Sequence, residues 1–432
     1  MKTAFLSLLP AFLIAAGTLA SAQQLDTLTL ERAVVIALEH QPALHGSEAD
    51  IRAAEAGARQ SRAGFFPSIG ATASGIHTDG VSVVSPSIPT RRLTHNTYTA
   101  ALQGNLTIWD FGKTSGRVSQ SDYLADAAGD DYVSARENLA VNTEVAFLGY
   151  LQAQRVVRVN EEAYDQASRH LAQAQAFFSV GKRPQLDVTK AEVDMLNANV
   201  TLIQARNALR VARIGLENIM GIHPAHEYTV SESASPEAID ATLDSARVSA
   251  LRNRSELIAA VARVDAGKGG VTAAWGQRLP TIAATGTYTW NGYAFPLYDR
   301  WNAGVTFSLP IFQGFGLVAG VELAEANEDI AQANLDVLKE SISLEVEQQW
   351  LAVHEAAERA VASAKLVEQA TENFRLVERQ YAAGVATALD QSDAQLTLSN
   401  ARITDIQAQY DHRTALVRLR RAMGISVLPS IH

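Results

Sequence analysis

Two aspartates, Asp390 and Asp393, follow closely on a turn centred on Gly384. Long Ala- and Leu-rich patterns flank Gly384, and glycine favours the left-handed backbone that ends a helix, so we expect a tight helix-to-helix turn. Thr387 can cap the second helix. Residues three apart share one face of a helix, and the helix dipole favours carboxylates in its first turns. The pair could attract cations, or it could be an ordinary capped helix start in solvent.

The same turn occurs twice in the chain. Gly181 stands 203 positions before Gly384, and the same offset aligns Asp187 with Asp390. The chain therefore contains two copies of one structural unit, and the fold must be predicted as a repeat of that unit. The predicted organisation is a signal peptide (1–22), a first repeat (23–222), a linker (223–245) and a second repeat (246–432).

The first 22 residues have the features of a secretory signal. Lys2 supplies a positive start, an apolar run follows, and Ala20-Ser21-Ala22 is a small-residue cleavage site. We expect the mature chain to begin at Gln23. No later stretch has the roughly 18 consecutive apolar residues of a membrane-spanning helix. The exported protein is then expected to be soluble or to cross a membrane as β-strands.

Composition excludes several functional classes. The chain has 432 residues and a formal net charge of −10, which has the wrong sign for a nucleic-acid binder. It has no cysteine, which excludes disulfides and thiol chemistry. The Gly-rich segments at 267–269 and 314–320 lack the spacing of a phosphate or dinucleotide loop. His223 and His226 have no clustered carboxylates beside them. We therefore expect no enzyme, no cofactor, no metal and no nucleic-acid partner.

Four segments alternate apolar and polar residues with the two-residue period of a β-strand. The predicted strands cover about 68–77, 97–109, 281–290 and 300–309. In the third, Ile282, Tyr288 and Trp290 lie on one face, with the aromatics toward the loop end. A soluble sandwich produces the same alternation, whereas a membrane barrel also explains strands of about ten residues and the aromatic rim. The smallest membrane barrels have about eight strands, so four could close one only by association of several chains.

Very long helical patterns follow each pair of strands. Residues 113–180 contain no proline and would span roughly 100 Å as one helix. The predicted long helices are 113–180 and 316–383, and the predicted return helices are 185–220 and 388–423. Helices at 47–64 and 246–276 lead into the strands and could stack end on end with the return helices. The fold class is therefore mainly α with a small β part.

Short motifs recur in a fixed order along both repeats. The strands start at FFPSIGA and RLPTIAA and end at LTIWDFGK and LPIFQGFG, the turns are VGKRPQLD and AGVATALD, and the repeats end at LENIMGI and LRRAMGI. In this duplicated order, over nearly all of the mature chain, the sequence resembles the TolC-type outer-membrane efflux proteins. The resemblance implies a homotrimer in which twelve strands form one outer-membrane barrel. Helices would continue this barrel as a tunnel across the periplasm.

The resemblance also implies roles for the two turns, which it places at the periplasmic tip, farthest from the membrane. Asp390 and Asp393 match an aspartate pair that rings the constriction in characterised members. Six carboxylates at the narrowest point of a trimer would attract cations, and their mutual repulsion should raise some of their pKa values.

A closing lock at this tip is also implied, with one departure from the family pattern. Asp187 and Tyr381 match residues that hold neighbouring tip helices closed by hydrogen bonding. A basic residue of the lock is replaced by Ala386, while Arg183 occupies the equivalent place in the first turn. The charge has either moved to the other turn or been lost from a weaker lock.

The function implied is the passive exit duct of a tripartite efflux or type I secretion system, located in the outer membrane and extending into the periplasm. Its partners would be outer-membrane lipid, an inner-membrane pump and a periplasmic adaptor protein that docks on the tip. The docking residues would be Val180, Gly181, Lys182, Arg183, Ala383, Gly384 and Val385. The partner pump would set the cargo, which the sequence leaves open. An exported periplasmic coiled-coil scaffold or adaptor without a pore is the alternative, although it would not need two duplicated pairs of strands.

Overall fold

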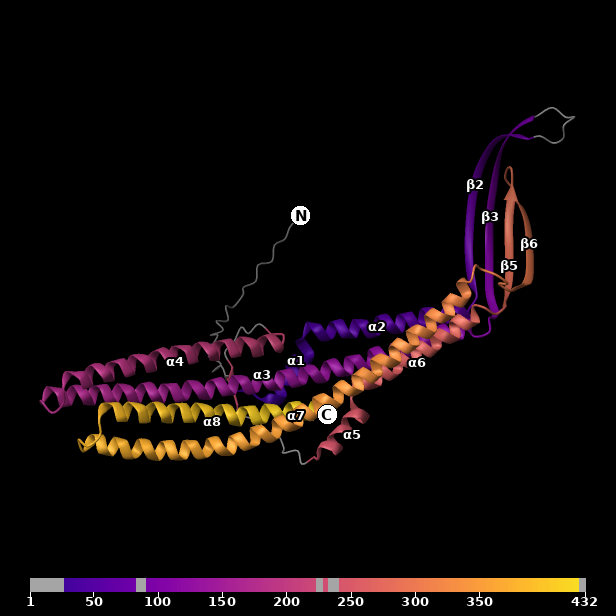
Figure 1. The fold of residues 1–432 in the computed structure, drawn as a ribbon. Helices are drawn as coiled ribbons and strands as arrows, with labels where there is room; N and C mark the ends of the chain where they lie inside the picture. The colour runs from indigo at the N-terminus through magenta and orange to yellow at the C-terminus, as the bar shows by residue number, and fades with distance from the viewer. Residues whose placement is uncertain (1–26, 83–90, 223–227, 232–240, 427–432) are drawn as a thin grey trace, which may run out of the picture.

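The computed structural model describes residues 27–82, 91–222, 228–231 and 241–426. The predicted signal peptide, most of the predicted linker, and both His223 and His226 lie outside these residues. The described part is a long rod of helices with a β-sheet that rises steeply from one end (Figure 1). Helices dominate and the sheet is small, so the predicted fold class is confirmed.

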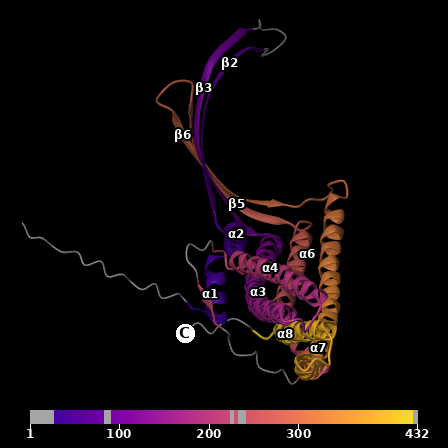
Figure 2. The same ribbon diagram turned by 90° about the vertical axis from the view of Figure 1, so that its left-hand side faces the viewer.

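Four antiparallel strands form the sheet, in the order β2-β3-β5-β6. Their bounds are Ser68–Ser82 (β2), Arg91–Trp109 (β3), Thr281–Gly292 (β5) and Tyr298–Ser308 (β6). Pairing of β3 with β5 joins the hairpins of the two halves of the chain. The edges of the sheet are β2 and β6, and the β2–β3 hairpin reaches well beyond the β5–β6 hairpin (Figure 2).

The β2–β3 hairpin is longer than the sequence predicted. The predicted strands ended at 77 and began at 97, but the ladder continues to the pair Ser82↔Arg91. His77 Nδ1 lies 2.7 Å from Asn96 Oδ1, and Thr94 Oγ1 donates to Asp79 Oδ1 at 3.1 Å. Polar cross-strand pairs thus extend the hairpin past the end of the apolar alternation.

The boundaries of the second hairpin and of the four long helices differ from the predictions by one or two residues, whereas the helix predicted at 47–64 begins five residues earlier, at Pro42. In the second hairpin, β5 continues to Gly292 and β6 covers 298–308, against predictions of 281–290 and 300–309. The four long helices are α3 (Lys113–Ser179), α4 (Gln185–Ile219), α7 (Gly316–Ala382) and α8 (Ala388–Ala422). Each ends one residue before the predicted end, because the last predicted residue is the C-cap, whose N–H bonds to the final turn.

Shorter helices pack along these long ones. They are α1 (Leu30–His40), α2 (Pro42–Arg62), α5 (Leu243–Asn253) and α6 (Ser255–Gly276), and a short 3₁₀ turn, η1 (Ala63–Phe65), follows α2. α2 and α4 lie in succession along α3 (Figure 1). The helix predicted at 246–276 is broken, because Arg254 has an extended backbone with ψ 122°. No helix in the described ranges has an apolar stretch long enough to cross a membrane.

The core of the rod lies where the short helices meet the long ones. Val34 of α1 packs there with Phe147 of α3 and Leu216 of α4. A short parallel pair, β1 (Thr27–Leu28) with β4 (Thr229–Val230), lies beside this core. The side chain of Arg421 of α8 is 7% exposed. Its Nη1 lies 3.7 Å from Glu137 Oε2 of α3, and its Nη2 lies 3.1 Å from Glu256 Oε2 of α6. This buried ion-pair network joins the two halves of the chain.

α3 and α6 cross at a contact that glycine permits. A Cβ atom on Gly116 would lie 2.5 Å from the backbone nitrogen of Ala273, and one on Gly269 would lie 2.7 Å from that of Gln120. Both distances are shorter than any ordinary van der Waals contact, so the two backbones touch. Gly269 belongs to the Gly-rich segment 267–269, and its role is therefore close helix packing.

We expect Gly116→Ala to lower the free energy of unfolding by about 1–3 kcal/mol, because the added methyl group meets backbone atoms that cannot rotate away. Gly129→Ala is the matched control on the same helix, since an added Cβ there meets nothing within 4 Å. It should raise stability by about 0.5–1 kcal/mol. Thermal unfolding of the purified protein measures both changes. Equal shifts for the two variants would contradict this account of the crossing.

Candidate functional site at the helical tip

Two helix-to-helix turns form the end of the rod opposite the sheet (Figure 1). In the first, Gly181 has φ +71°, and the N–H of Lys182 donates to Phe177 O at 2.9 Å. In the second, Gly384 has φ +79°, and the N–H of Val385 donates to Gln380 O at 2.9 Å. Both bonds are the long-range bond of a Schellman helix end, which requires a left-handed residue. The glycines therefore fix two turns of the same shape.

Arg183 connects the two turns. Its Nη2 donates to the backbone oxygen of Ala386 at 3.3 Å, and its Cζ lies 4.9 Å from the centre of the Tyr381 ring. Its Nη1 lies 3.9 Å from Asp187 Oδ2. The side chains of Arg183 and Asp187 are 21% and 14% exposed, so these contacts are partly shielded from water. We call Arg183, Asp187, Tyr381 and the Ala386 carbonyl the tip latch.

The aromatic member of the tip latch is buried between the two helical hairpins, which are α3 with α4 and α7 with α8. Tyr381 is 1% exposed and packs with Ala386 and Phe177, and the His170 ring meets its ring edge-on at 5.2 Å. Burial, reinforced by the Asp187 carboxylate, raises the pKa of Tyr381. The hydroxyl is protonated at neutral pH, yet it makes no hydrogen bond to any described residue. The structure thus brings Asp187 and Tyr381 together around Arg183.

The acidic pair lies on exposed surface at the start of α8. Asp390 Oδ2 accepts from the backbone N–H of Thr387 at 2.8 Å and from its hydroxyl at 2.6 Å. The Thr387 hydroxyl oxygen accepts in turn from the backbone N–H of Asp390 at 3.2 Å, which completes a capping box. The side-chain bond to Thr387 lowers the pKa of Asp390. Asp393 lies one turn further on and is also exposed. Asp390 therefore caps the helix and still presents charge to solvent.

Exposed apolar residues border both turns. Val180 and Val385 are 66% and 77% exposed, and Leu186 and Leu389, which are equivalent in the two copies, are also exposed. Sequence reasoning included this leucine pair only within the turn motifs and did not identify it as surface. The sequence did contain a signal for this exposure, because each leucine is the second residue of its return helix and lies opposite the buried face of that helix. Sequence reasoning also missed His170, which no motif marks.

Comparison with known proteins accounts for this architecture. The family model described as outer membrane efflux protein matches residues 33–222 and 246–425, which is most of the chain. The chain belongs to the outer membrane efflux protein family. It is therefore an outer-membrane channel that extends into the periplasm, and the channel prediction is confirmed over the scaffold without a pore.

Relatives of the chain match nearly its whole length. It is 26% identical over 404 residues to outer membrane protein TolC of Escherichia coli K12, covering 89% of this chain and 79% of TolC. It is 22% identical over 423 residues to outer membrane efflux protein BepC of Brucella suis, covering 96% of this chain and 90% of BepC. The fold is similar to that of the Campylobacter jejuni CmeC outer membrane channel, with a TM-score of 0.81 and 19% identity. The match covers 93% of this chain and 87% of the CmeC chain.

Proposed function

We propose that three copies of this efflux protein form one passive exit duct, gated at the helical tip and without enzymatic activity of its own. The open sheet carries this proposal. Each of its edge strands, β2 and β6, is paired with a described strand on one side only. An unpaired edge exposes hydrogen-bonding groups that a lipid environment cannot satisfy. Three such sheets, joined edge to edge, supply the twelve strands of a closed barrel.

A stripe of apolar residues on α7 supports the same assembly. Leu323, Ile330, Val337, Leu344 and Leu351 follow one another at intervals of seven residues, and each is more than half exposed in the single chain. An interval of seven is the period at which packed helices meet. We assign this α7 stripe to contact with a neighbouring copy in the helical tunnel.

The tip would be the end that engages other proteins. Its exposed residues, including Val180, Gly181, Lys182, Ala383, Gly384 and Val385, offer a docking surface to a periplasmic adaptor that links the duct to an inner-membrane pump. The tip latch would hold the closed state until docking. Asp390 and Asp393, brought together from three chains, would form an acidic ring that selects for cations.

The assembly can be tested on the α7 stripe. The double variant Val337→Glu plus Leu344→Glu places charge in the proposed contact, and we expect it to elute as a monomer from size-exclusion chromatography with light scattering. It should also form no channels in planar bilayers. The control Gln332→Glu adds a charge on another face of α7 and should stay trimeric. A trimeric, conducting stripe variant, or a wild-type protein that is monomeric in detergent, would refute the proposed duct.

A further inference from the structure

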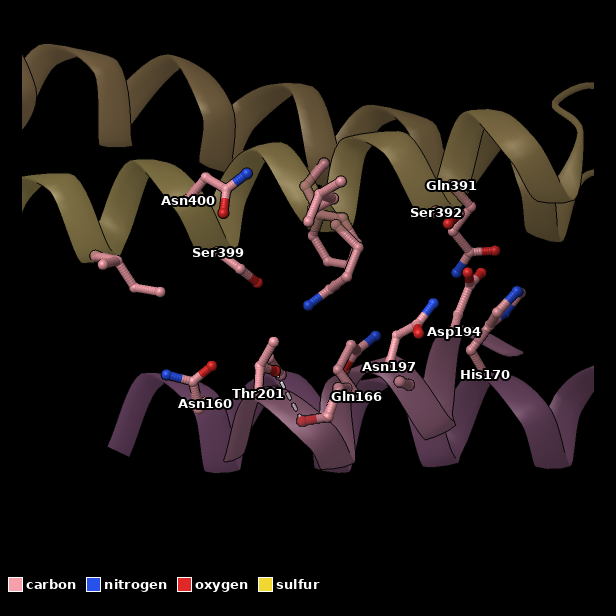
Figure 3. A pocket seen from close by; sticks show the side chains of 17 residues that line it. Asn160, Gln166, His170, Asp194, Asn197, Thr201, Gln391, Ser392, Ser399 and Asn400 are labelled. Carbon is pink, nitrogen blue, oxygen red and sulfur yellow. Dashed lines mark hydrogen bonds between the residues drawn. The ribbon is translucent and has the colours of Figure 1, made fainter. Parts of the chain in front are cut away.

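A cavity of about 240 Å³ lies between the two helical hairpins, a few turns from the tip (Figure 3). Its walls come from α3 and α4 on one side and from α7 and α8 on the other. Each hairpin also has its own small apolar core, around Leu202 in the first and Leu398 in the second. The lining of the cavity is mixed. Its apolar part consists of Ala163, Ala167, Ala198, Phe374, Leu396 and Ile403.

Four buried polar atoms of the lining have no hydrogen-bond partner among the described residues. They are His170 Nδ1, Asp194 Oδ2, Gln391 Oε1 and Gln395 Oε1. His170 and Gln391 are 8% and 4% exposed. In Figure 3, Gln391 reaches from α8 toward Asp194 and His170 on the opposite wall. Buried polar atoms cost free energy unless they are paired, so this arrangement favours an occupant.

The chemistry of the unpaired atoms defines that occupant. Three of the four are oxygens that only accept hydrogen bonds. Asp194 contributes a negative charge, and no lysine or arginine is among the lining residues. Burial lowers the pKa of His170, which keeps its imidazole neutral at neutral pH. Among the unpaired atoms of the cavity, acceptors therefore outnumber donors, and no lysine or arginine of the lining compensates the Asp194 carboxylate.

We propose that this cavity is a binding site for small alkylammonium cations, with the ammonium group on Asp194, Gln391 and Gln395 and the alkyl chain against Phe374 and Leu396. An ammonium group offers three donors and no acceptor, which matches the three unpaired oxygens. Because the site draws on both hairpins, a bound cation contacts α4 and α8 together. It stabilises the arrangement in which the hairpins are packed against each other.

The site lies within one chain, so its test does not depend on conduction or on assembly. Ligand-observed NMR on the purified full-length protein would measure binding of n-butylammonium. Tetramethylammonium is the matched comparison ligand, since it carries the same charge but has no N–H donors. We expect saturable binding of n-butylammonium and at least about tenfold weaker binding of tetramethylammonium, because charge-assisted hydrogen bonds supply the difference.

Matched variants locate the binding. Asp194→Asn keeps the side-chain shape and should weaken n-butylammonium about tenfold or more, whereas Glu192→Gln removes an exposed charge from the same helix and should leave affinity unchanged. Gln395→Glu adds a second carboxylate to the cavity and should strengthen binding. Equal binding of the two cations, an unchanged Asp194→Asn protein, or equal losses in Asp194→Asn and Glu192→Gln would overturn the site.

Discussion

Replacing Arg183 with alanine should open the tip of the isolated channel. The substitution removes the hydrogen bond to Ala386 O and the contact with the Tyr381 ring, both of which link the two turns, and it also removes the ion-pair partner of Asp187. A partly buried contact of a cation with an aromatic ring contributes about 0.5–2 kcal/mol, and each 1.4 kcal/mol changes an equilibrium about tenfold. We therefore expect the open population to rise by about tenfold per chain.

Single-channel recording in planar bilayers measures this change as a higher mean conductance at neutral pH, without adaptor or pump. Lys182→Ala is the matched control, because Lys182 is the neighbouring cation in the same turn and is exposed. Its removal should leave the conductance near that of the wild type. If both variants raise the conductance equally, the loss of positive charge near the pore, and not the tip latch, controls the current. Arg183→Ala recordings that match the wild type would remove Arg183 from the gate.

The tip shows how far sequence reasoning could reach. It identified Arg183, Asp187 and Tyr381 and placed them near the turns, because turn glycines and the repeat mark these positions. It left open whether the basic charge had moved from the second turn to the first. Arg183 meets a backbone oxygen at the equivalent position of the other copy, and a carbonyl group carries no side-chain signal. Only the packing of one hairpin on the other decides such a contact.

The sheet shows a different limit. The strands were predictable where apolar and polar residues alternate, as from Thr281 to Trp290, because one face meets an apolar environment. Beyond Ile76 the alternation stops, and a polar strand then has the composition of a loop. The hairpin persists because polar partners face one another across it, as His77 and Asn96 do. Which residues face one another depends on register, and register cannot be read from composition.

The cavity between the hairpins was not predictable for a related reason. Gln391 and Asp194 lie far apart in the sequence, and each looks like an ordinary polar residue on a long helix. Their burial follows from the way α8 packs on α3 and α4. Polar residues on helices usually face solvent, so the sequence alone predicts solvent exposure for both residues. The structure places both in the cavity lining instead.

Neutralising the acidic pair should reduce the preference of the channel for cations. The double variant Asp390→Asn plus Asp393→Asn removes six carboxylates from the proposed ring of a trimer. We expect the reversal potential in a potassium chloride gradient to move from the cation-selective side toward zero. Asparagine is preferable to alanine at 390, because its side-chain oxygen can still accept from the N–H of Thr387 and preserve the capping box. Planar-bilayer recordings under a salt gradient provide the measurement.

The control must separate a local field at the tip from the net charge of the protein. Glu358→Gln plus Glu368→Gln removes the same number of charges from exposed positions of α7 away from the tip. Charges separated by more than about 10 Å are largely screened at ordinary salt, so this variant should keep the wild-type reversal potential. A ring at the narrowest point acts on every ion that passes, whereas distant surface charge does not. If both double variants shift the potential equally, selectivity arises from the whole surface, and Asp390 serves only as a helix cap.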